Sequence, residues 1–126
     1  MIAAGLGYRN ICTEEDILAA LDKACRDYAV KRECLGMLVT SRIKKTDHAI
    51  LNAAETLKVP LLFVSYEDLQ TVSDRILTHS AISMKVTGSP CLSEAAALVA
   101  AGKHSRLLGA RIIHHNVTCA IATDGD

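Results

Sequence analysis

The sequence predicts a single α/β domain over residues 1–126, in three layers, with a mostly parallel β-sheet, helices on both of its faces and a C-terminal β-hairpin. Three observations carry this expectation. The chain has 126 residues, 50% of them hydrophobic, which suits one domain with one core. Short apolar runs alternate with segments of helical periodicity as far as residue 77, and two β-prone runs follow near the C-terminus.

The N-terminal part of the chain repeats a strand followed by a helix. Thr13 and Asp16 have the spacing of a capping box at the start of the first helix, and Ser65 and Asp68 have it at the third. Such alternation is typical of parallel strands joined by right-handed crossovers. The expected pairs are Ile2–Gly7 with a helix that begins at Thr13, Leu35–Thr40 with Asp47–Leu57, and Leu61–Val64 with Ser65–Leu77.

The rest of the chain departs from this alternation. An Ala-rich helix is expected to end at Gly102, and His114–Asn116 should separate the two strands of the hairpin. In order, the expected elements are an extended segment at Ser80–Val86, a turn at Gly88–Pro90, the Ala-rich helix at Ser93–Ala101, and strands at Leu107–Ile113 and Val117–Thr123.

Composition disfavours several classes of function. Lys plus Arg and Asp plus Glu both number 14, and three Tyr and one Phe are the only aromatic residues, so we expect no nucleic-acid binding. The five cysteines are odd in number and form no CxxC pair, which argues against a disulfide framework or a zinc ribbon. The sequence shows no signal peptide and no apolar run of membrane-spanning length, so we expect a cytoplasmic protein without membrane contact.

Basic residues follow the first two expected strands. Ligands of an open parallel sheet bind beyond the carboxyl ends of its strands, so Arg9 and Lys44 should share that edge and suit a ligand rich in carboxylates. Gly5 and Gly7 would let the backbone approach the ligand. Alternatively, the glycines serve a tight turn and the cations are ordinary solvated charges. A nucleotide site is disfavoured because Asn10 stands where the dinucleotide fingerprint has its third glycine.

The segment Gly88–Glu94 leads into the Ala-rich helix. Ser89 or Ser93 could cap this helix, with Glu94 in its first turn. Glu94 could instead act as a general base or contact a ligand. No His or Asp at short spacing completes a nucleophilic triad with these serines, so the segment alone does not indicate an enzyme.

Three histidines, His104, His114 and His115, are candidate metal ligands. Adjacent histidines on a strand or tight turn are expected to point in different directions, and no carboxylate or Cys completes the set at ligand spacing. We therefore expect no metal site and no cofactor. Cys12 and Cys91 each precede a helix and are expected to be structural.

Four segments in a fixed order fit one pattern, and the first two lie in the N-terminal half. Gly5–Asn10 fits G-[IL]-G-C-[RK]-x, with Tyr8 in the place of Cys. Ile43–Asp47 fits a loop in which a Lys shortly precedes an acidic residue, and Lys44 is the matching Lys.

The other two segments lie in the C-terminal half. Gly88–Ala97 fits G-x-x-S-V-x-E-x-A-A, with Cys91-Leu92 in the place of Ser-Val and Glu94 at the acidic position. Thr118–Ala122 fits T-x-A-[IV]-A, and Arg111 precedes it where a Lys is usual. With these four motifs the chain resembles the CobE family, which also forms the C-terminal domain of CbiG proteins of cobalamin biosynthesis.

The resemblance implies a role in building the corrin ring. CbiG proteins open the lactone of cobalt-precorrin-5A and release a two-carbon fragment, and the stand-alone form belongs to the aerobic route. A first implied function is to bind or carry a polycarboxylate corrinoid or precorrin-type intermediate, with other corrin-pathway enzymes as further partners. The residues expected to bind it are Gly5, Gly7, Arg9, Lys44, Gly88, Ser89, Glu94 and Arg111.

Two alternatives remain beside this binding function. One is a lactone hydrolase of the same pathway, with Glu94 as general base and Lys44 or Arg111 stabilising the developing oxyanion. The other is a nucleotide-binding module, against which the departure at Asn10 counts.

Overall fold

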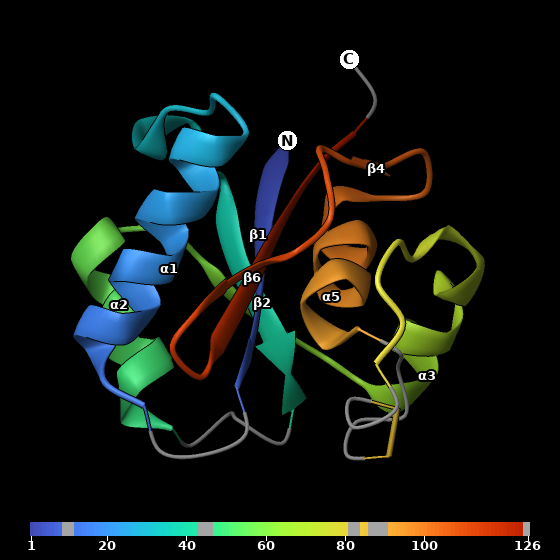
Figure 1. The fold of residues 1–126 in the computed structure, drawn as a ribbon, viewed down its shortest axis with the longest axis horizontal. Coiled ribbons are helices and arrows are strands. Elements are labelled where there is room, and N and C mark those ends of the chain that lie inside the picture. The colour runs from blue at the N-terminus through green and yellow to red at the C-terminus, as the bar shows by residue number, and fades with distance from the viewer. Residues whose placement is uncertain (9–11, 43–46, 81–83, 86–90, 125–126) are drawn as a thin grey trace.

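The computed structural model of the chain is an α/β fold with a mixed sheet of six strands (Figure 1). It describes all residues except 9–11, 43–46, 81–83, 86–90 and 125–126. The strands are β1 (Ile2–Tyr8), β2 (Met37–Ser41), β3 (Leu61–Val64), β4 (Arg106–Leu107), β5 (Ile112–His114) and β6 (Val117–Thr123). The helices are α1 (Glu14–Asp27), α2 (His48–Leu57), α3 (Tyr66–Gln70) and α5 (Leu92–Ala101), with 3-10 turns at Arg32–Cys34 and Ser73–Arg75. Among the described residues, no helix is long and apolar enough to cross a membrane.

The expectation of a mostly parallel sheet is wrong. β1, β2 and β3 are parallel neighbours, whereas β6 lies antiparallel to β1, and β4 and β5 both lie antiparallel to β6. The ladder between β1 and β6 runs from Ile2 opposite Thr123 to Tyr8 opposite Val117. β6 runs against β1 because the turn after β5 brings the chain to the end of β1, where β6 begins.

The first two strand and helix units form where the sequence predicts them. The Thr13 hydroxyl accepts a hydrogen bond from the Asp16 N–H at 3.1 Å and caps α1. The side chain of Asp47 caps α2 in a similar way. Ser65 and Asp68 form the predicted capping box at α3. Side-chain acceptors at these starts satisfy N–H groups that have no partner within the helix.

Two predictions for the middle of the chain differ from the structure. The helix expected over Ser65–Leu77 ends at Gln70, because the Thr71 hydroxyl and N–H both donate to the Asp68 carbonyl and occupy the acceptor that a continuing helix would use. Ser80–Val86, expected to be extended, lies partly outside the described residues. Its described part includes a helical contact, since the Met84 N–H donates to the Ser80 carbonyl at 3.0 Å.

The strand predicted over Leu107–Ile113 is divided into β4 and β5. Both pair with β6, and the Leu108 N–H still donates to the Ile121 carbonyl of β6 at 2.9 Å, but residues 108–111 belong to neither strand. The N–H of Arg111 donates to the carboxylate of Glu94 and not to a neighbouring strand. A side-chain acceptor from α5 therefore interrupts the run.

Two hydrophobic cores lie on opposite faces of the sheet. α1 and α2 cover one face, and α5 and α3 cover the other (Figure 1). Because side chains of a strand alternate between the two faces, Ala4 and Leu6 belong to the first core and Ala3 to the second. Gly5 and Gly7 face α5.

Gly5 allows the backbone of α5 to approach the backbone of β1. An ideal Cβ at Gly5 would lie 2.0 Å from the carbonyl oxygen of Ser93 and 2.8 Å from the amide nitrogen of Ala97. Both atoms belong to the backbone of α5, so no side-chain rotation relieves the overlap. The close packing of α5 on β1 thus requires a glycine at this position.

We predict that Gly5→Ala lowers the free energy of unfolding by about 1–3 kcal/mol, because the added methyl group forces α5 away from β1. Urea denaturation followed by circular dichroism measures this loss. Gly36→Ala is the matched control, since its added Cβ meets the sulfur of Met1 at 2.6 Å, the mobile end of a side chain. Equal losses in the two variants would contradict the packing role of Gly5.

Candidate functional site

The carboxyl ends of the parallel strands share one edge of the sheet, here called the carboxyl edge. It lies at the bottom of Figure 1, where β1 ends at Tyr8 and β2 ends at Ser41. α1, α2 and α5 begin at this edge, and Leu92 of α5 would contact a Cβ at Gly7 at 3.6 Å. Helix N-termini carry partial positive charge, so the carboxyl edge favours anionic ligands.

The structure brings two of the predicted site residues together, Glu94 and Arg111. Gly5 and Gly7 belong to β1 and pack against α5, which gives both glycines a reason other than ligand binding. The predicted residues that lie outside the described part of the chain are Arg9, Lys44, Gly88 and Ser89.

Glu94 lies in the first turn of α5 and is 0% exposed. Its Oε1 accepts hydrogen bonds from the N–H groups of Leu77 at 2.8 Å and Thr78 at 2.9 Å. Its Oε2 accepts from the hydroxyl of Thr78 at 2.7 Å and from the N–H of Arg111 at 2.8 Å. One carboxylate thereby joins α5 to the segment after α3 and to the segment between β4 and β5.

These contacts bear on the candidate role of Glu94 as a general base. An ionised carboxylate has about four lone-pair sites. Here each oxygen accepts two hydrogen bonds, which come from Leu77, Thr78 and Arg111. A general base needs an acceptor that can reach the proton of water. The geometry therefore supports a structural role for Glu94 and offers no support for a catalytic one.

Arg111 presents a cation next to the start of α5. Its side chain is half-buried, and its Nη1 lies 4.0 Å from the sulfur of Cys91. Its backbone is held by Glu94, while no ion pair of the described residues includes its guanidinium. A charged group held in this way is suited to receive an anion from solution.

Cys91, and not Ser89 or Ser93, is the N-cap residue of α5, and its side chain makes no capping hydrogen bond. The thiol is 0% exposed and lies 3.5 Å from the hydroxyl of Ser93. Burial raises the pKa of this thiol, and the Ser93 hydroxyl, the Glu94 N–H and Arg111 only partly oppose that rise. A buried, protonated thiol is a poor nucleophile, in keeping with the structural role expected for Cys91.

Tyr8 marks the end of β1 at the carboxyl edge, where the family pattern has Cys. Its side chain is 5% exposed. Burial, together with a hydrogen bond to Asp47 and the charge of that carboxylate, holds the pKa of the phenol far above its usual range. Because Asp47 caps α2, this contact joins the end of β1 to the start of α2. In the sequence, the only sign of this contact is that Tyr8 replaces the Cys of the family pattern.

The arrangement of the histidines in the C-terminal turn differs from the one that the sequence led us to expect. A carboxylate does stand beside His114 and His115, since the ligand atoms of Asp16, His114 and His115 lie within 4.8 Å of one another. Asp16 comes from the first turn of α1 and is distant in sequence, so spacing along the chain could not reveal it. His104 is exposed and is not part of this group.

The chain is similar to proteins of cobalamin biosynthesis. The family model described as Cobalamin synthesis G C-terminus matches residues 2–122. Protein CobE of Sinorhizobium sp is 29% identical over 121 residues, which make up 96% of this chain and 79% of that protein.

Solved structures with the same fold include two with substantial sequence identity. CobE, described as a protein from the cobalamin (vitamin B12) biosynthetic pathway, matches with a TM-score of 0.92 and 28% identity over 97% of this chain and 89% of that one. Cobalamin biosynthesis protein ChiG from Agrobacterium tumefaciens str. C58 matches with a TM-score of 0.79 and 36% identity over 100% of both chains.

A third structure, a cobalamin biosynthesis protein G homologue from Sulfolobus solfataricus, is similar in fold alone. It matches with a TM-score of 0.70 and 22% identity, over 99% of this chain and 37% of that chain. The fold described above is thus also found within a longer chain.

We predict that Glu94→Gln destabilises the protein by about 1–3 kcal/mol, because the amide NH₂ cannot accept the hydrogen bonds that one carboxylate oxygen accepts. Urea denaturation measures the loss, and amide hydrogen exchange should accelerate at Leu77, Thr78 or Arg111. Glu55→Gln, an exposed position in α2, is the control and should change stability by less than about 0.5 kcal/mol. A Glu94→Gln protein as stable as the control would refute the structural role.

Proposed function

The chain belongs to the family described as Cobalamin synthesis G C-terminus and is a protein of cobalamin biosynthesis; from this premise we propose that it binds or carries a corrinoid or precorrin-type intermediate at the carboxyl edge. The peripheral carboxylates of such an intermediate would be received by Arg111, Arg9 and Lys44. Precursors of this class are polyanionic, and cations that stand at one edge of a rigid sheet are suited to several carboxylates at once.

The observation that carries this proposal is how the backbone and the guanidinium of Arg111 are placed. Its main chain is held by the buried carboxylate of Glu94, while none of the ion pairs in the described parts of the chain includes its guanidinium. Fixing the backbone limits the conformations of the side chain and so reduces the entropy lost when an anion binds.

Arg9 and Lys44 enter the proposal through their positions in the sequence. Arg9 directly follows the last residue of β1, and Lys44 comes three residues after Ser41, the last residue of β2. Both lie outside the described residues, so their part in the site rests on the family motif and on the strand that precedes each. The same holds for Gly88 and Ser89, which precede α5.

Lactone hydrolysis is the alternative within the same pathway. It requires a group that activates water, and Glu94, which the sequence singled out, has both oxygens engaged by backbone and hydroxyl donors. Binding without turnover therefore agrees better with the geometry. A cytoplasmic location and contacts with other enzymes of the pathway belong to the same proposal, as does the lack of nucleic-acid binding. A cysteine set that forms no disulfide in the described part of the chain agrees with a reducing compartment.

We predict that Arg111→Gln weakens binding of a corrin polycarboxylate, cobyrinic acid, by about tenfold or more, the equivalent of one charge-assisted hydrogen bond. The shift of the corrin absorbance on titration with protein measures the dissociation constant. Binding should weaken as salt rises, because the contacts are ionic. Substitution of the Arg111 side chain keeps the backbone N–H that donates a hydrogen bond to Glu94, so the fold is expected to persist.

Two controls separate a carboxylate site from general affinity for corrins. Arg106→Gln removes an exposed Arg from β4, at the opposite edge of the sheet, where Arg106 pairs with Thr123, and should leave binding unchanged. A corrin whose side chains are amidated, such as cyanocobalamin, should bind far more weakly than cobyrinic acid. Equal binding of the two corrins would overturn the proposed recognition of carboxylates.

Pathway lactones incubated with the protein should keep their mass, and a mass change would establish the hydrolase instead.

A further inference from the structure

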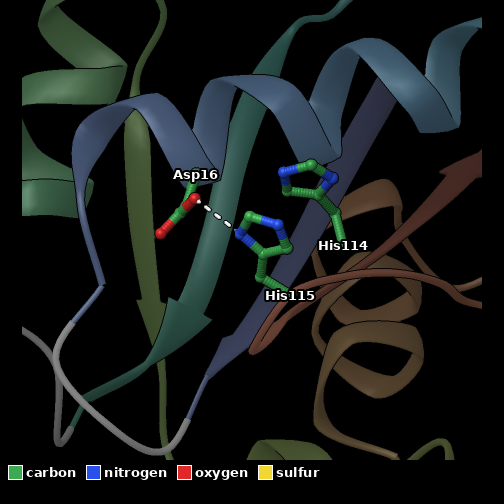
Figure 2. A group of neighbouring side chains, drawn as sticks. All are labelled: Asp16, His114 and His115. Carbon is green, nitrogen blue, oxygen red and sulfur yellow. Dashed lines mark hydrogen bonds and ion pairs between the residues drawn. The ribbon is translucent and has the colours of Figure 1, made fainter.

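A carboxylate and two imidazoles meet where α1 begins and β5 ends (Figure 2). The side chains belong to Asp16, His114 and His115, and one potential ligand atom from each lies within 4.8 Å of the other two. The Nδ1 of His115 is 3.2 Å from the Oδ1 of Asp16. The group includes neither Arg111 nor Glu94, and none of its three side chains has a role in the binding of carboxylates proposed above.

The backbone at His115 explains why two adjacent histidines lie together. Side chains of consecutive residues in a strand point to opposite faces. His114 is the last residue of β5, but His115 has a φ of +53°, in the left-handed region. This conformation turns the second ring back beside the first, and the ring centroids are 4.3 Å apart with 22° between the planes. A non-glycine residue seldom adopts this conformation unless its surroundings favour it.

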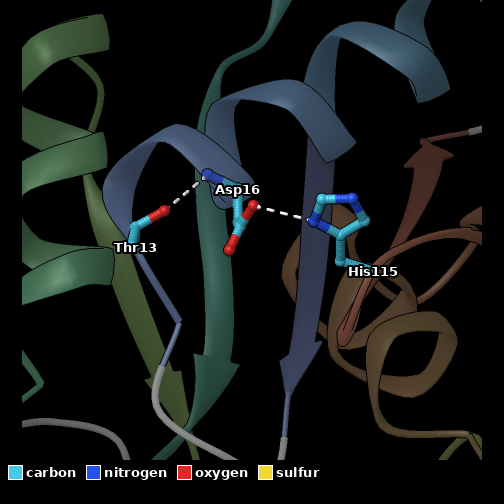
Figure 3. A network of polar contacts seen from close by, with 3 residues as sticks. All are labelled: Thr13, Asp16 and His115. Atoms are coloured by element: carbon cyan, nitrogen blue, oxygen red, sulfur yellow. Dashed lines mark hydrogen bonds and ion pairs between the residues drawn. The ribbon is translucent and has the colours of Figure 1, made fainter.

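Asp16 is held in position by the start of α1. Its N–H donates to the hydroxyl of Thr13, the N-cap residue, at 3.1 Å, and its carboxylate extends toward His115 (Figure 3). The first turn is thereby fixed before any ligand binds. The side chain of Asp16 is 26% exposed and that of His115 is 72% exposed, so an ion can reach the group from solvent.

We propose that Asp16, His114 and His115 bind one divalent transition-metal ion of the type of Zn²⁺. Two imidazole nitrogens and one carboxylate oxygen form a ligand set that suits Zn²⁺ and its neighbours in the first transition row, whereas Mg²⁺ and Ca²⁺ require mainly oxygen ligands. Three protein ligands leave a position for water or for an anion. Neutral imidazoles coordinate such an ion, so protons and the metal compete for the same ring nitrogens.

The distances require only a small adjustment. Ligand atoms around a tetrahedral Zn²⁺ are about 3.4 Å apart, given metal–ligand distances near 2.1 Å. The observed limit of 4.8 Å must therefore shrink by roughly 1.4 Å, which rotation of the partly exposed Asp16 and His114 side chains, together with the exposed His115, can supply. The nearest cation on the same face of α1, Lys23, donates to the carbonyl of Ile113 at 3.1 Å. Its ammonium is thus held at the residue before His114 and is not a member of the group.

The alternative is an ordinary surface ion pair between Asp16 and His115, which would contribute little to stability. That alternative involves only two of the three side chains and gives no role to His114. Zinc titration distinguishes the two, because an ion pair alone would give no saturable uptake of metal.

The experiment is isothermal titration of the metal-free protein with Zn²⁺, in a Cys34→Ser background because Cys34 is the exposed thiol. We expect one equivalent to bind. Asp16→Asn, His114→Ala and His115→Ala should each weaken binding by at least about tenfold, since even loss of a group that only supports a ligand costs 10- to 100-fold. In parallel, ¹⁵N-resolved imidazole signals of both His114 and His115 should shift on addition of Zn²⁺.

His104→Ala is the matched control, because His104 is exposed and lies outside the group. It should leave zinc affinity unchanged. Circular dichroism and the urea midpoint confirm that each variant is folded. Absence of zinc uptake by the parent protein, uptake that is insensitive to all three substitutions, or loss of uptake in His104→Ala would each overturn the proposal. None of these outcomes depends on whether cobyrinic acid binds.

Discussion

The contact between the backbones of α5 and β1 at Gly5 positions most of the C-terminal half of the molecule. With the carbonyl of Ser93 only 2.0 Å from where a Cβ would stand, α5 lies close against β1 in a rotation that turns the backbone of Ser93 toward Gly5. That rotation directs Glu94 toward the segments at Leu77–Thr78 and Arg111. A glycine in the first strand therefore determines where a cation close to the last strand is held.

The first two strand and helix units could be predicted because their signals are local. Capping residues such as Thr13 and Ser65 act on N–H groups within three positions, so the sequence alone contains both partners. The direction of β6 could not be predicted in this way. Six of its seven residues are buried, and a strand buried on both faces has the same apolar pattern whether its neighbours are parallel or antiparallel. The break between β4 and β5 depends on a carboxylate from α5, which no local pattern contains.

Of the predicted site residues, the structure brings together Glu94 and Arg111. Strand order led us to expect cations at one edge of the sheet, because the ends of parallel strands meet there, but Arg9 and Lys44 lie outside the described residues. The partners of Glu94 are separated from it by 16 and 17 positions in the sequence, and those of His115 by 99. Contacts at such separations follow from tertiary packing. The left-handed backbone of His115 is likewise a property of the folded turn, so the assumption that adjacent histidines diverge was reasonable for a strand and wrong for this turn.

The pairing of β1 with β6 also has a consequence for synthesis of the chain. β1 is made first and β6 last among the strands of this fold, yet they are neighbours over seven residue pairs. A growing chain that has already produced β1, β2 and β3 still lacks both the strand and the helix that cover β1. Until residues 92–123 are available, one edge of the central strand keeps unpaired N–H and C=O groups that a neighbouring nascent chain could bind. Long-range pairing of this kind slows folding, and the ladder of β1 can be completed only after β6 has been made.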